Sequence, residues 1–79
     1  MSPTFKYERG YRFYMWSREE DRAHVHVSKA GLEAKIWLEP VVEVYENDGF
    51  SQKELGVILK IVKENENDFK TKYKQRLGR

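Results

Sequence analysis

Apolar residues recur with two different periods along this chain, and the period changes near residue 51. Over residues 32–39 they alternate with charged residues almost without a break, which is typical of a half-buried β-strand. Beyond residue 51 the spacing becomes that of one face of an α-helix, at Leu55, Ile58, Leu59 and Val62. Ser51 and Glu54 form the pattern of a capping box, which marks a first helical turn. The chain is therefore expected to place strands first and a helix last.

Several earlier segments also have the composition of strands. Together with the alternating segment they predict four strands, at residues 4–8, 11–16, 23–28 and 32–39. Arg9-Gly10 and Lys29-Ala30-Gly31 are interpreted as tight turns, which join neighbouring strands into hairpins. Residues 41–45 are predicted to form a short fifth strand, with a helical turn as the alternative, and residues 47–49 end it.

Seventy-nine residues make one small domain. We predict an α+β fold for residues 1–79: a small antiparallel sheet of four or five strands over residues 1–46, and a C-terminal α-helix over residues 51–77 packed on one face. A continuous helix is favoured, with a break in the polar segment 64–68 as the alternative. Gly56 lies inside this helix, where it costs up to ~1 kcal/mol relative to alanine, and a close contact with the sheet would explain it.

The strand alternation assigns side chains to two faces of the sheet. The inward set, which the helix covers, is Tyr11, Phe13, Met15, Val25, Val27, Leu32, Ala34, Ile36 and Leu38. The outward set is Arg12, Tyr14, Trp16, His24, His26, Glu33, Lys35, Trp37 and Glu39. An exposed face rich in aromatic residues and arginine indicates an interaction site, with Tyr14, Trp16 and Trp37 as its binding residues. Two alternatives would cover this face: the C-terminal segment, through Phe69 and Tyr73, or the sheet of a second subunit.

The chain has two histidines, His24 and His26, and their spacing in a strand places both rings on one face. A metal site needs three or four ligands, and no motif marks a third, so we expect neither a metal nor another cofactor. In a metal-independent RNA-cleaving toxin, the histidines would act as base and acid, and Arg12 or Lys35 would stabilise the phosphate charge. In a binding module they would be hydrogen-bonded parts of a strand surface.

Charge is distributed unevenly along a chain whose net charge is only +2. The C-terminal end has no acidic residue after Asp68 and forms a basic tail, with Lys70, Lys72, Lys74 and Arg76 as candidate contacts. Such a tail fits RNA, DNA or an acidic partner. The alternative is a solvated helix end whose cations complement the helix dipole. The last helical turns also carry a spacing of seven residues that suits pairing with a second copy, at Leu55, Val62, Phe69 and Arg76.

Three features that the sequence lacks bear on the cellular location of the protein. It has no cysteine, no apolar run approaching ~18 residues, and no basic-then-apolar layout at its start. We therefore expect a cytoplasmic protein that does not interact with a membrane.

Taken in their order along the chain, the motifs resemble those of the small bacterial domain-of-unknown-function family 4160. The matching residues are Pro3-Thr4, Gly10-Tyr11-Arg12-Phe13, Ser17, Glu19, His24-Val25-His26-Val27, Ala34-Lys35-Ile36-Trp37-Leu38, Pro40, Gly49-Phe50-Ser51, Glu54-Leu55 and Glu64-Asn65. Ala23 departs from the family, which commonly has proline there. The resemblance implies a small cytosolic bacterial or phage protein, from a two-gene arrangement that looks like a toxin–antitoxin pair. It therefore implies a cognate protein partner, without assigning the toxin or the antitoxin side.

Overall fold

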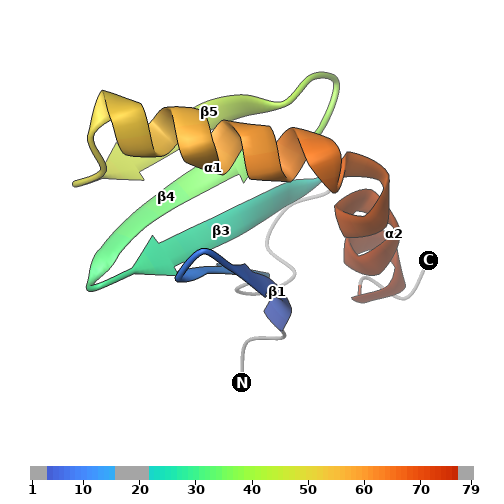
Figure 1. Ribbon diagram of the computed structural model, residues 1–79. Helices are drawn as coiled ribbons and strands as arrows, with labels where there is room; N and C mark the ends of the chain where they lie inside the picture. The colour runs from blue at the N-terminus through green and yellow to red at the C-terminus, as the bar shows by residue number, and fades with distance from the viewer. Residues whose placement is uncertain (1–3, 16–21, 77–79) are drawn as a thin grey trace.

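The computed structural model describes residues 4–15 and 22–76 and shows an α+β fold (Figure 1). Its elements are, in chain order, β1 (Thr4–Glu8), β2 (Tyr11–Tyr14), β3 (His24–Lys29), β4 (Leu32–Trp37), β5 (Glu43–Asp48), α1 (Gln52–Glu64) and α2 (Glu66–Arg76). The five strands form one antiparallel sheet in the order β1-β2-β3-β4-β5. The predicted fold class and the fifth strand are therefore confirmed.

Two-residue turns set the register of the outer and central hairpins. Arg9 and Gly10 join β1 to β2 with φ of 54° and 85°, and Ala30 and Gly31 join β3 to β4 with φ of 52° and 83°. Positive φ at both turn residues gives the twist that matches two flanking strands. Both turns lie where the sequence predicts them, and the second one fixes His24 opposite Trp37.

The core lies between the sheet and α1, which runs along one face of the sheet (Figure 1). The predicted inward side chains are buried except for Leu32, which is half-buried. Helix α1 covers them with Leu55, Ile58, Ile61 and Val62. The predicted capping box is confirmed: the Glu54 amide donates to Ser51 Oγ at 3.1 Å, and the Ser51 amide donates to Glu54 Oε1 at 3.3 Å. This cap fixes where α1 begins.

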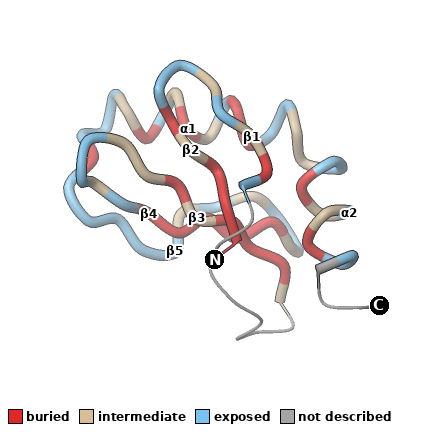
Figure 2. Tube along the Cα trace, turned by 90° about the horizontal axis from the view of Figure 1, so that it is seen from below, coloured by how far each residue is buried: buried red, intermediate tan, exposed pale blue. Residues whose placement is uncertain are grey.

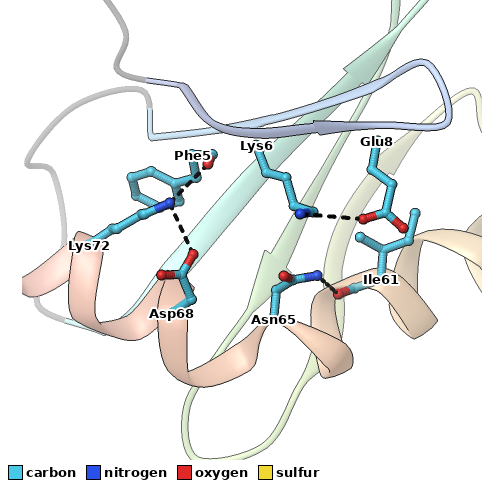
Figure 3. A network of polar contacts seen from close by, with 7 residues as sticks. All are labelled: Phe5, Lys6, Glu8, Ile61, Asn65, Asp68 and Lys72. Atoms are coloured by element: carbon cyan, nitrogen blue, oxygen red, sulfur yellow. Dashed lines mark hydrogen bonds and ion pairs between the residues drawn. The ribbon is translucent and has the colours of Figure 1, made fainter.

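The prediction of one continuous C-terminal helix is wrong, because the helix breaks at Asn65. The Asn65 side chain donates to the Ile61 carbonyl oxygen at 2.8 Å (Figure 3), and its backbone carbonyl accepts from the Phe69 amide at 2.9 Å. An asparagine that bonds the backbone locally competes with the helical ladder. Asn65 therefore ends α1, and α2 begins at the next residue.

The break turns α2 down across the end of the sheet (Figure 1). There Phe69 packs on Phe5 and Phe13, with ring centroids 5.8 and 5.6 Å away. Lys72 Nζ donates to the Phe5 carbonyl oxygen at 3.1 Å and pairs with Asp68 at 3.0 Å (Figure 3). The residues spaced by seven therefore pack within this chain rather than being left for a second copy, because Leu55, Val62 and Phe69 are all buried in its own core.

Gly56 is not explained by contact with the sheet. It is exposed on α1, and a Cβ added there would meet nothing within 4 Å. The expected close approach is therefore absent. Neither of the two described helices is long and apolar enough to cross a membrane.

Candidate functional site

The candidate site is the face of the sheet opposite α1, which we call the histidine face. It is formed by Arg12, Tyr14, Arg22, His24, His26, Glu33, Lys35, Trp37 and Tyr45. Strand β3 places the two histidine rings side by side, with centroids 5.2 Å apart and planes at 74°. Across the sheet, His26 lies opposite both Tyr14 and Lys35. Period-two alternation therefore groups these side chains correctly.

The expectation that this face is open to solvent is wrong for four of its side chains, which are buried. His24 is 0% exposed, Tyr14 5%, and both Lys35 and Trp37 8%. In Figure 2 most of β2 and half of β3 are coloured as buried, whereas most of β5 is coloured as exposed. Tyr45, at 51%, is the large aromatic residue of this face that stays accessible. Trp16, the third predicted binding residue, lies outside the described residues.

Stacked rings explain why the face is shielded. The Arg12 guanidinium lies 4.5 Å from the centre of the Tyr14 ring, which stacks on His26 at 5.4 Å. His24 meets Trp37 edge-on at 5.8 Å. Because these side chains lie against one another along the sheet, each covers part of its neighbour, and such pairs add to the stability of simple burial.

The C-terminal segment covers one end of this face, as one of the two alternatives predicts. The Tyr73 ring from α2 meets His24 edge-on at 5.2 Å, whereas Phe69 packs among the inward residues. His24 Nδ1 donates to the Arg22 carbonyl oxygen at 3.0 Å, since a carbonyl oxygen can only accept. In the neutral ring, Nε2 then carries the lone pair. The His24 ring is thus held by the Tyr73 ring and by its hydrogen bond to the Arg22 carbonyl oxygen.

Cations on this face are held by aromatic rings and by neighbouring oxygens. Arg22 lies over Trp37 at 4.0 Å, donates to the Glu39 carbonyl oxygen at 2.6 Å and pairs with Glu43 at 3.3 Å. Lys35 Nζ lies 5.2 Å from the centre of the Trp37 ring and 4.9 Å from that of Tyr45. These contacts fix the cations against the sheet.

The structure thus brings the predicted catalytic residues to one face of the sheet, where they pack against aromatic rings and hydrogen-bond within the protein. They are His24, His26, Arg12 and Lys35. Arg12 Nε donates to Thr4 Oγ1 at 2.9 Å, and Lys35 lies buried against rings. Within residues 4–15 and 22–76, no three histidine or acidic side chains are grouped so that they could hold a metal ion. Glu33, the acidic residue of this face, accepts from the Tyr14 hydroxyl at 2.9 Å.

Sequence reasoning missed two contributors to the face, Arg22 and Tyr45. Arg22 falls between two predicted strands, and nothing local marks its contact with Trp37. Tyr45 lies in the predicted fifth strand, and its ring centre is 4.6 Å from that of Trp37. A bulge shifts the register between Lys35 and Ile36, so simple alternation from β4 would not place Tyr45 reliably.

The basic tail is paired within the protein over most of its length. Lys70 pairs with Glu66 at 2.7 Å, Lys72 with Asp68 at 3.0 Å, and Lys74 with Glu39 at 4.0 Å. The Arg76 side chain lies outside the described residues. Three of the four predicted nucleic-acid contacts are therefore already engaged by acidic groups, and RNA or DNA binding there stays a prediction.

Tyr14 gives the histidine face a measurable response to alkaline pH. Burial, then the hydrogen bond and negative charge of Glu33, raise the pKa of Tyr14 from near 10 to about 12, while Arg12 lowers it slightly. The folded state therefore favours the neutral phenol. Its stabilisation is complete below pH 10 and is lost as the pH rises through 12.

We expect Tyr14→Phe to weaken this loss of stability between pH 10 and 12, measured by urea unfolding at fixed pH values. Tyr11 stays as a second contributor, because burial and Glu54 raise its pKa as well. In an ultraviolet titration, the variant should lack the latest phase of tyrosinate formation. An unchanged titration curve would mean that the Tyr14 hydroxyl is not held as described.

Comparisons with known proteins agree with the motif resemblance. No curated protein and no solved structure matches the chain. The model of the family described as "Domain of unknown function (DUF4160)" matches residues 10–74, which include the histidine face, α1 and most of α2. The chain therefore belongs to the DUF4160 family.

Proposed function

We propose that this chain binds a protein partner through the corner of the histidine face where Tyr45 lies against Trp37, with Arg22 and Lys35 beside it. The observation that carries the proposal is an exposed tyrosine supported by a rigid aromatic and cationic base. Aromatic side chains presented in this way contribute much of the binding energy at protein interfaces. Because the base is already packed, little side-chain entropy is lost on binding.

The open edge of the sheet extends this corner. Among the described strands, β5 pairs only with β4, so its other edge can accept an added strand. Glu46 and Asp48 are exposed on β5 and repel a phosphate backbone. The corner therefore favours a protein partner with basic residues over RNA or DNA.

The burial of His24 weighs against the alternative of an RNA-cleaving toxin. A phosphate could reach this ring only by displacing Tyr73 or Trp37, which both pack against it. Lys35 would likewise have to leave the Trp37 and Tyr45 rings. We expect the purified protein to leave cellular RNA intact. RNA cleavage that is lost in His26→Ala would instead support the catalytic reading.

The gene arrangement implied by family resemblance suggests where to find the partner. We propose that the product of the adjacent small gene is the cognate protein, as in a two-gene toxin–antitoxin-like module. Co-expression of the two chains should give a complex that stays together in size-exclusion chromatography. Separate elution at micromolar concentration would count against this partner.

Tyr45→Ala is expected to weaken the complex with the adjacent gene product about 10- to 100-fold, as loss of a binding hot spot does. Isothermal titration calorimetry measures the change. Tyr7→Ala is the matched control, since Tyr7 is 71% exposed but lies at the opposite edge of the sheet. The affinity of this variant for the adjacent gene product should stay within about twofold of the wild-type value. Equal losses from the two variants would remove Tyr45 as the contact.

A further inference from the structure

The outer face of α1 carries a group of residues that the proposed function does not use. Lys53, Gly56, Lys60 and Lys63 are three or four residues apart, so they share one side of the helix, and all four are exposed. Leu55, Ile58 and Val62 point the opposite way, into the core. We call the first group the α1 outer face. It lies on the side of α1 opposite the core residues, whereas Tyr45 packs on Trp37 on the face of the sheet that α1 does not cover (Figure 1).

The lysines of this face differ from the other lysines that the structure describes. Lys6, Lys70, Lys72 and Lys74 form ion pairs, and Lys29 and Lys35 lie over aromatic rings. Within the described ranges, Lys53, Lys60 and Lys63 have neither an ion pair nor a hydrogen bond. Glu64 lies beside Lys60 and Lys63, and the three lysines still leave this side of the helix with a positive balance of charge.

Gly56 lies among these lysines and is not needed by the fold. A Cβ at this position would meet no atom within 4 Å, and alanine would favour the helix. The missing side chain lowers the surface, so that another chain can approach the α1 backbone closely. Gly56 and the half-buried Leu59 line a shallow hollow together with Lys60, Lys63 and Glu64.

We propose that the α1 outer face docks an acidic protein segment. The segment sets one apolar side chain into the hollow, over Gly56 and against Leu59. Carboxylates on either side of it pair with Lys60 and Lys63. The charge of the surface selects an acidic occupant, and the apolar floor beside the glycine selects a protein. Glu64, which also lines the hollow, opposes a continuous phosphate backbone.

A synthetic peptide tests this proposal without the natural partner. The probe is a twelve-residue peptide with one central leucine flanked by glutamates, titrated into ¹⁵N-labelled protein and followed by the amide signals of residues 52–64. We expect shifts at these residues. A control peptide with glycine in place of leucine should bind at least fivefold more weakly, and Lys60→Glu combined with Lys63→Glu should abolish the shifts.

Gly56→Ala separates binding from folding. It should raise the urea midpoint, because alanine favours the helix, and yet weaken the acidic peptide at least fivefold by filling the hollow. Absence of shifts on α1, an affinity unchanged by Gly56→Ala, or an oligouridine that binds α1 more tightly than the peptide would each overturn the proposal. None of these outcomes bears on Tyr45, so the two surfaces are tested independently.

Discussion

Phe69→Ala is expected to lower the free energy of unfolding by about 3 to 5 kcal/mol, the range for removing a fully buried aromatic ring. Phe69 has no exposed surface, and its ring packs on Phe5 and Phe13. A domain of this length has a total stability of about 4 to 12 kcal/mol. The variant should therefore be largely or completely unfolded at 37 °C. Urea unfolding followed by circular dichroism measures the loss.

Thr71→Ala provides the control for this prediction, because Thr71 is exposed on the same helix. Its unfolding free energy should stay within about 0.5 kcal/mol of the wild type. If Phe69→Ala unfolded at the wild-type urea concentration, α2 would not belong to the cooperative core. The contacts among the three phenylalanine rings would then contribute little to the fold.

The α2 docking shows where sequence reasoning about the fold stops. The strands, the turns and the start of α1 follow from local rules, since alternation, positive φ and the Ser51 cap each act within a few residues. At the break, the Asn65 side chain shares the Ile61 carbonyl oxygen with the Asn65 backbone amide, and residues 64–68 have no apolar pattern to reveal it. The direction of α2 depends on Phe5, which is remote in sequence, so no local period predicts it.

For the histidine face too, one property could be predicted from the sequence and another could not. Which residues share it follows from the period of a strand, and the structure places Tyr14, His24 and Trp37 together as that period requires. How far they are exposed does not follow, because exposure depends on sideways stacking and on Tyr73 from another element. Face membership is thus a local property, whereas accessibility belongs to the complete fold.

His24→Ala is expected to lower the free energy of unfolding by about 3 kcal/mol, because it empties a fully buried site and removes a hydrogen bond. The lost contacts are those with Trp37 and Tyr73, and the Arg22 carbonyl oxygen loses the Nδ1 donor. His24→Phe retains a ring but not the donor, so it should cost less, about 1 to 2 kcal/mol. Urea unfolding of the two variants separates packing from hydrogen bonding.

His26→Ala is the comparison that decides between a structural and a catalytic role for the pair. His26 is half-buried and stacks on Tyr14, so its removal should cost about 1 kcal/mol. A structural pair predicts that stability falls much further for His24 than for His26. Two catalytic histidines would instead give two stable variants that both lose the same activity. Equal and small losses of stability would therefore remove the main argument against chemistry at this face.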